Sequence, residues 1–92
     1  MTVGTKWSIR FNKIAQKNFE KLDKQAQKRI QTFLRERLLP AKNPRLFGKP
    51  LSGKFSDFWR YRISDYRIVC KIEDKELIIL VVRVAHRREA YE

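Results

Sequence analysis

Four basic side chains fall on one face of a hairpin predicted for residues 58–71, where they can bind phosphate groups. The runs 58–63 and 66–73 are rich in aromatic and β-branched residues, and Ser64-Asp65 between them is compatible with a two-residue turn. Directly opposed residues of an antiparallel pair share a face, so one face is apolar and pairs Trp59 with Cys70, Tyr61 with Ile68 and Ile63 with Tyr66. The opposite face, which we call the cationic face, carries Arg60, Arg62, Arg67 and Lys71.

The cationic face has two interpretations. Polar residues commonly line the solvated face of an antiparallel sheet, and charge runs are usually solvated. However, like charges on adjoining strands repel one another unless an anion lies between them. Within residues 58–71 neither strand has an acidic residue on this face, which favours a surface that binds a polyanion.

The net charge of the chain points to the same kind of partner. Its 92 residues include 22 Lys and Arg against 10 Asp and Glu, a net charge of +12. The first 57 residues hold 14 basic and 4 acidic side chains, which accounts for +10 of that excess. A charge this high favours nucleic acid, an acidic membrane or an acidic protein as partner.

Length and composition exclude several classes of protein. A chain of 92 residues forms a single domain over 1–92 with a modest core. The longest apolar run, 77–82, is too short for a membrane span, so we expect a soluble, cytoplasmic protein without membrane contact. One cysteine and one histidine are too few for a zinc or iron–sulfur site, so we expect no metal and no cofactor. Cys70 is expected in the core.

The N-terminal half predicts one strand and two helices. Residues 7–11 alternate between apolar and polar side chains, as a strand does. Helical spacing of apolar residues follows from Ile14 to residue 22 with Asn12 as N-cap, and again over 26–38, after a break near Asp23. Residues 40–57 contain all three prolines and two of the three glycines, which predicts an irregular connection.

A last strand is expected over 77–84, interrupted only by Arg83. A three-residue turn over 74–76 places Arg83 opposite Arg67 on the cationic face, whereas a two-residue turn directs it into the core. We prefer the longer turn because an unpaired buried arginine is costly. The order of elements predicts a compact α+β domain, β-α-α-β-β-β, with two helices packed on one face of a mainly antiparallel sheet. The tail 86–91 leaves the last strand beside the cationic face.

Four motifs in this order resemble the successive landmarks of the RelE/ParE toxin superfamily. They are Gly48-Lys49-Pro50-Leu51, FWRYRI at 58–63, DYRIV at 65–69 and HRREAY at 86–91. The order of strands and helices also agrees, so the resemblance covers nearly the whole chain. It implies a RelE-like fold and a bacterial toxin that a small antitoxin neutralises.

The resemblance also implies which residues act. RelE-like members cut messenger RNA in the ribosomal A site, and the basic face is similar to that branch. Arg60 and Arg62 match two basic strand residues, Arg67 matches the arginine after a tyrosine, and Arg87 and Tyr91 match residues of the tail. This chain departs from the family in two ways: arginines replace lysines at the first two positions, and the turn and tail look shorter than in some members.

The arginines limit the chemistry that each residue can perform. Metal-free RNA cleavage uses the ribose 2′-OH as nucleophile and needs a base, an acid and a cation for the phosphorane. Arginine suits the last role but is a poor base. The titratable candidates that remain are Lys54, Lys71, His86 and Tyr91, and His86 has the most suitable ordinary pKa. The expected catalytic set is therefore Arg60, Arg62, Arg67, His86, Arg87 and Tyr91, and the expected RNA- or ribosome-binding set is Lys49, Lys54, Lys71, Arg83 and Arg88.

Three functions stay open on the sequence alone. The leading one is a ribosome-dependent endoribonuclease, with ribosome, messenger RNA and a cognate acidic antitoxin as partners. The second is a ParE-like inhibitor of DNA gyrase without RNase activity. The third is a non-catalytic nucleic-acid-binding module, which the cation count alone also allows.

Overall fold

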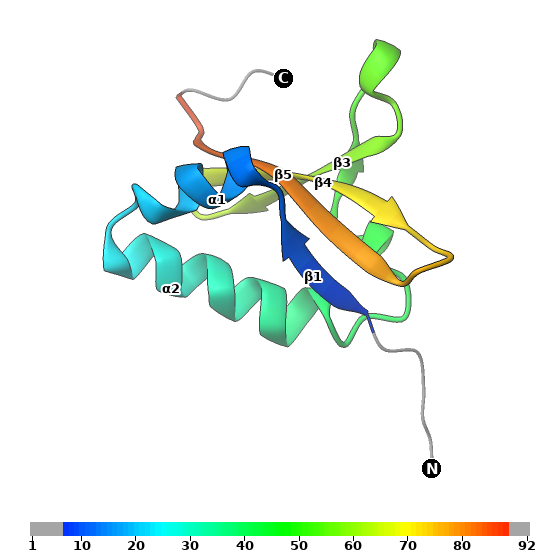
Figure 1. The fold of residues 1–92 in the computed structure, drawn as a ribbon, viewed down its shortest axis with the longest axis horizontal. Coiled ribbons are helices and arrows are strands. Elements are labelled where there is room, and N and C mark those ends of the chain that lie inside the picture. Colours follow the sequence, from blue (N-terminus) through cyan, green and yellow to red (C-terminus); the bar gives the residue numbers. More distant parts are fainter. Residues whose placement is uncertain (1–6, 89–92) are drawn as a thin grey trace.

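Five strands form one mixed sheet in the computed structural model, which describes residues 7–88 (Figure 1). The strand order is β1-β5-β4-β3-β2; β1 runs parallel to β5, and the other neighbouring pairs are antiparallel. Helices α1 and α2 cover one face, so the predicted α+β fold is confirmed. The elements are β1 (Ser8–Phe11), α1 (Lys13–Glu20), α2 (Lys24–Phe33), the π turn η1 (Leu34–Leu38), the 3₁₀ turn η2 (Pro44–Phe47), β2 (Lys49–Pro50), the 3₁₀ turn η3 (Gly53–Phe55), β3 (Phe58–Ile63), β4 (Tyr66–Glu73) and β5 (Ile78–His86).

Both helices begin where the sequence predicts. The side chain of Asn12 accepts a hydrogen bond from the Ala15 amide at 2.8 Å, and that of Asp23 accepts one from the Ala26 amide at 2.7 Å. Each cap satisfies an amide that has no acceptor within its own helix. After α2 the helical backbone continues through η1 and ends before Pro40, as expected. Over residues 7–88, every helix is too short or too polar to span a bilayer.

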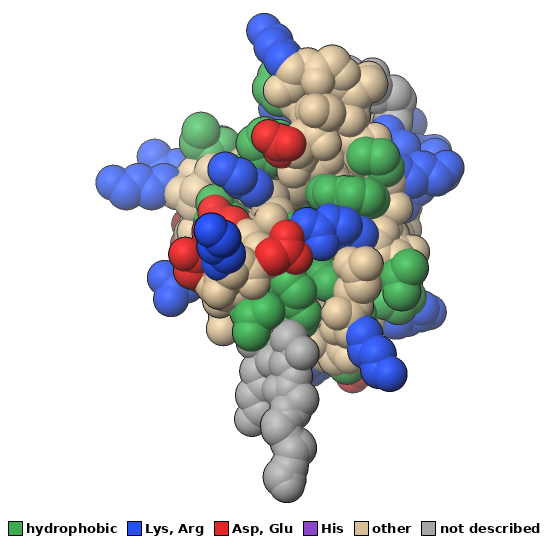
Figure 2. Space-filling view, turned by 90° about the vertical axis from the view of Figure 1, so that its right-hand side faces the viewer, with side chains coloured by type: hydrophobic (Ala, Val, Ile, Leu, Met, Phe, Trp, Pro, Cys, Tyr) green, Lys and Arg blue, Asp and Glu red, His purple; other side chains and the backbone are tan. Residues whose placement is uncertain are grey.

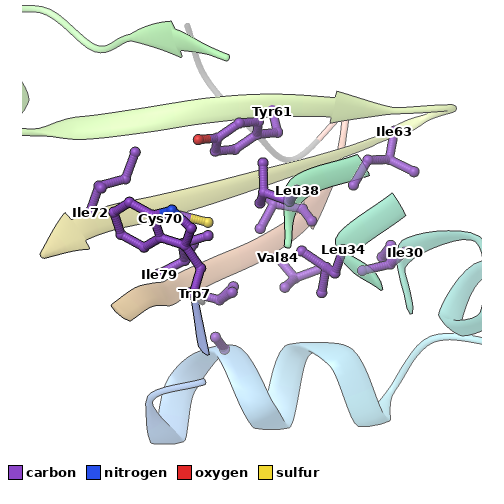
Figure 3. Packing of buried hydrophobic residues seen from close by; sticks show 13 residues of the cluster. Trp7, Ile30, Leu34, Leu38, Tyr61, Ile63, Cys70, Ile72, Ile79 and Val84 are labelled. Carbon is purple, nitrogen blue, oxygen red and sulfur yellow. The ribbon is translucent and has the colours of Figure 1, made fainter. Parts of the chain in front are cut away.

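The core lies between the helices and the apolar face of the β3–β4 hairpin (Figure 3). Tyr61, Ile68 and Cys70 are completely buried, and Leu38 of η1 belongs to the same cluster. The Tyr61 hydroxyl donates to the Pro44 carbonyl at 2.9 Å, which satisfies this polar group inside the core. Cys70 is completely buried, which confirms its expected place in the core, and this burial raises the pKa of its thiol.

The register of the β3–β4 hairpin is the predicted one. Trp59 pairs with Cys70, Tyr61 with Ile68 and Ile63 with Tyr66. Ser64 in the turn has a φ of 55°, the left-handed conformation that two-residue hairpin turns require. The apolar and cationic faces are therefore separated as expected.

The register of β4 against β5 differs from the prediction. The turn spans four residues, 74–77, and Leu77 takes a φ of 55°. This offset by itself would direct Arg83 into the core. A bulge then inserts one residue, because Cys70 pairs with Val81 but Val69 pairs with Arg83. The two offsets cancel, so Arg83 lies on the cationic face as expected, but opposite Val69 and not opposite Arg67.

The connection over residues 40–57 has more regular structure than predicted. It contains η2, η3 and the two-residue strand β2, which pairs with β3 and places Lys49 opposite Arg60. The Arg45 guanidinium donates to both carboxylate oxygens of Asp74, at 3.1 and 2.7 Å. This bidentate pair ties η2 to the β4–β5 turn.

Candidate functional site

Three transverse rows of side chains make up the sheet face that points away from the helices. Successive rows are two residues apart along β3, or about 7 Å. The first row is Arg62, Arg67 and Ala85; the second is Lys49, Arg60, Val69 and Arg83; the third is Phe58, Lys71 and Leu80. The cationic face thus extends across four strands, from β2 to β5.

A groove of about 420 Å³ opens over these rows. The loop around η3 forms one side of it and stands out from the sheet near β3 (Figure 1). The start of α1 forms the other side. The groove is lined by Asn12, Ile14, Leu51, Phe55, Phe58, Arg60, Arg67, Val69, Val82 and Arg83.

Arg67 lies in the floor of the groove and is only 7% exposed. Its Nη1 donates to the Tyr66 carbonyl at 3.1 Å, but its buried Nε has no hydrogen-bond acceptor among the described residues. Burial lowers the pKa of Arg67, and the charges of Arg62, Arg60 and Arg87 lower it further. Arginine still stays protonated near neutral pH. A buried cation with an unsatisfied donor therefore faces a groove into which an anion can fit.

Arg87 stands beside Asp65 at the hairpin end of this face. Its amide donates to the Asp65 carbonyl at 2.6 Å, and its Nη1 lies 3.8 Å from an Asp65 carboxylate oxygen. Both side chains are more than half exposed, so the pair contributes little to stability. It holds the start of the tail against the β3–β4 turn, close enough for Arg87 to affect the pKa of Arg67.

The other predicted arginines and lysines surround the groove. Arg60 and Arg83 line it, on either side of Val69. Exposed Arg62 lies opposite Arg67, and exposed Lys71 lies opposite Phe58. The remaining predicted contacts lie further out: Lys49 on β2, Lys54 in η3 and Arg88 after β5 are all exposed.

His86 is not on the cationic face, contrary to expectation. It pairs with Tyr66, which lies on the face covered by the helices, and the two rings meet edge to face at 5.3 Å. Its Nδ1 accepts a hydrogen bond from the Arg88 amide at 3.2 Å. The physical reason is the alternation of side chains along β5, which separates His86 from Arg83 and Ala85. Tyr91 lies outside the described residues.

Acidic side chains gather at the end of the molecule that carries the β4–β5 turn (Figure 2). Glu73, Asp74 and Glu76 are in or beside this turn. The arginines of the first two rows lie toward the opposite, hairpin end. An anion in the groove is therefore attracted toward the rows that contain Arg67 and Arg60.

Sequence reasoning missed the apolar part of the groove. The helical spacing of the sequence predicts Ile14 on the buried stripe of the first helix, yet Ile14 is 65% exposed. Phe55 lies in the connection that the sequence predicts to be irregular, and it is 44% exposed. No simple period marks either residue, because their position depends on how α1 and the η3 loop approach the sheet.

The chemistry of the groove is that of positive charge and hydrogen-bond donors. Within residues 7–88, no cluster of three His, Cys, Asp or Glu side chains is placed to hold a metal ion. Arginine forks bind two phosphate oxygens at once and stabilise negative charge that develops on them. The arrangement fits a phosphodiester better than a neutral ligand.

Comparison with known proteins gives one family. The model of the ParE toxins of type II toxin–antitoxin systems, parDE, matches residues 9–91. The toxin RelG of Mycobacterium tuberculosis is 26% identical over 85 residues, which cover 92% of this chain and 95% of that protein. The toxin–antitoxin complex RelBE2 of the same organism has a chain with a TM-score of 0.81 at 26% identity, covering 89% of this chain and 99% of that one. The isolated Escherichia coli RelE toxin has a TM-score of 0.71 at 24% identity, covering 87% and 83%.

Proposed function

We propose that this chain, which belongs to the ParE toxin family, acts as a ribosome-dependent endoribonuclease. It is the toxin of a type II toxin–antitoxin system. On this proposal it cuts messenger RNA in the ribosomal A site, in the bacterial cytoplasm and without a metal ion. The observation that carries the proposal is Arg67, a buried cation with an unsatisfied Nε in the floor of a groove. A phosphate in the groove would lie beside this buried positive charge and compensate it.

The reaction that suits these residues is attack by a ribose 2′-OH on the adjacent phosphorus. The bond from phosphorus to the 5′-oxygen breaks, and the products are a 2′,3′-cyclic phosphate and a free 5′-OH. One proton leaves the 2′-OH and one reaches the 5′-oxygen, so the step balances without a co-reactant. Arg60, Arg67 and Arg83 stabilise the charge that develops on the phosphorane oxygens.

Proton transfer requires a different kind of group. Arginine does not release its proton near neutral pH, and His86 lies on the other face of the sheet. Two amines lie next to residues that line the groove: Lys71 pairs with Phe58, and Lys54 Nζ lies 5.7 Å from the centre of the Phe55 ring. The phenol of Tyr91 belongs to the tail. We assign proton transfer to this set and phosphate binding to the arginines.

We expect the substitution His86→Gln to change RNA cleavage by less than about threefold, well below the roughly 10²- to 10⁴-fold loss typical of a general acid or base. The reason is that its ring packs on Tyr66 and faces away from the groove. Cleavage rates in a translating extract, measured across pH 5.5–8, check this. A loss above a hundredfold, with an unchanged melting temperature, would return the catalytic role to His86.

The partners follow from the family and the charge. Toxins of this class have a cognate antitoxin, and the M. tuberculosis relative is a toxin–antitoxin complex. We propose that the antitoxin of this chain is acidic, because the net charge is +12. The basic surface outside the groove, including Lys49 and Arg88, is proposed to contact ribosomal RNA.

Primer extension on messenger RNA after brief induction of the toxin tests the proposed activity. We expect cuts at regular codon positions in a translated message. A matched transcript without its start codon should stay intact, because cleavage depends on the ribosome. An intact message in induced, growth-arrested cells contradicts the proposal.

Inhibition of DNA gyrase is the second candidate, because the matching family model is that of the ParE toxins. A gyrase inhibitor needs a surface for protein binding, whereas the charge of Arg67 in the groove suits an anionic ligand better. A supercoiling assay with purified gyrase separates the two functions. Inhibition at stoichiometric toxin, together with uncut messenger RNA, would select the second.

A further inference from the structure

One wall of the groove is apolar although the floor is cationic. This apolar wall consists of Leu51, Phe55 and Phe58 on the η3 side, and Ile14 faces it from the start of α1. Ile14 is 65% and Phe55 is 44% exposed, so large apolar side chains meet water in a groove that is otherwise suited to phosphate. Exposed apolar groups that gather at a polar site commonly mark a binding surface.

The η3 loop holds Phe55 in place at this wall. The Leu51 amide donates to the Phe58 carbonyl at 3.0 Å, and the Ser56 amide donates to the Gly53 carbonyl at 3.1 Å. Gly53 has a φ of +67°, a conformation that favours glycine. The Phe55 and Phe58 rings meet edge to face with centroids 6.3 Å apart, so Phe58 supports one edge of Phe55.

The wall stands next to the arginines along β3. Phe58 and Arg60 project from the same face of this strand, two residues or about 7 Å apart. Arg67 follows in the next row, opposite Arg62. A ligand that spans these rows has an anionic group at the arginines and a flat apolar group at the phenylalanines. One nucleotide of a single strand has this arrangement.

We propose that Phe55, supported by Phe58 and faced by Ile14, binds an unstacked base of single-stranded RNA in the groove. The inference rests on the proposed function in that RNA is the polyanion. Single-stranded RNA is recognised by stacking its bases on aromatic rings, and each stacked base changes affinity by roughly 5- to 150-fold. The groove combines an apolar wall with a cationic floor, which favours RNA over a purely apolar protein segment. Such a segment would leave the charge of Arg67 uncompensated.

The test is binding of short RNA strands that cannot be cut. A fluorescein-labelled pentanucleotide with every 2′-oxygen methylated is compared with five versions that lack one base each. We expect one abasic position to weaken binding to the wild type by about 5- to 50-fold. Phe55→Ala should remove that difference, and Phe55→Trp should keep it. Leu46→Ala is the control, because Leu46 is 75% exposed and lies outside the groove.

The outcomes test the base-binding site independently of the proposed endoribonuclease activity. Equal affinity for all six strands, or an undiminished difference in Phe55→Ala, overturns the base site. Loss of antitoxin binding in Phe55→Ala with unchanged RNA binding overturns it too and assigns the wall to protein. Base-dependent binding by a toxin that leaves messenger RNA intact in cells supports the base site and rejects only the endoribonuclease.

Discussion

Arg67→Met is expected to abolish toxicity and at the same time to stabilise the free protein. Arg67 is 93% buried, its Nε lacks an acceptor among the described residues, and its neighbours Arg62 and Arg60 repel it. Methionine has a similar unbranched stem and removes the desolvated charge. A gain of about 1 kcal/mol raises the melting temperature of a domain of this size by roughly 4–8 °C. Loss of the charge that we propose to bind phosphate should slow the proposed RNA cleavage by roughly 10²- to 10³-fold.

Growth after induction, primer extension and thermal unfolding by circular dichroism measure the three effects. Arg35→Met is the matched control. Arg35 has a 64% exposed side chain and lies 3.9 Å from Glu36, so its loss should change neither toxicity nor stability. Full toxicity of Arg67→Met would contradict the site. A melting temperature more than about 5 °C below the wild type would instead make Arg67 a structural residue.

Gly48→Ala is expected to give the second large effect, this time on the fold. A Cβ at position 48 lies 2.8 Å from Cε2 of Tyr61 and 2.9 Å from the Arg60 carbonyl oxygen. Neither neighbour can move easily, since the Tyr61 ring is buried and anchored to Pro44, and the carbonyl belongs to β3. Forcing an extra carbon into such a contact costs roughly 1–3 kcal/mol. Urea unfolding should show this loss of stability.

The φ of Gly48 is −126°, so the effect comes from contact and not from backbone conformation. Ser52→Ala is the control in the same connection, because Ser52 is exposed and its side chain caps no turn. It should change stability by no more than about 0.5 kcal/mol. A Gly48→Ala protein as stable as Ser52→Ala would mean that β2 and η2 can separate from β3 at no cost.

The predictable parts of the fold are those in which a short sequence pattern determines both the element and the neighbour with which it pairs. The β3–β4 hairpin has period-2 alternation and a two-residue turn, so its register follows from residues 58–73 alone. The N-cap at Asn12 was predictable for the same reason, since a cap acts within three residues, whereas Asp23 was expected only as a break between the helices.

What failed depends on offsets that no short pattern encodes. The β4–β5 turn is one residue longer than expected, and the bulge after Val81 adds one more. Arg83 still lies on the predicted face of the sheet because the extra turn residue and the bulge shift the register by one residue each, and the two shifts cancel. Side chains alternate between the two faces along β5, and this places His86 on the face that the helices cover. A match to a sequence motif does not show on which face a residue lies. Lys49 joined the arginine rows only because β2 pairs with β3.

Because Cys70 is completely buried, the reactivity of its thiol can be used to detect unfolding of this protein. Cys70 is the only cysteine in the chain, it is completely buried, and its thiol stays protonated because burial raises its pKa. An alkylating reagent therefore labels the chain only when the sheet opens. Pulse labelling can follow that opening without any engineered probe, in cells as well as in solution. Cellular oxidants meet the same barrier, so the folded toxin has no redox control through this thiol.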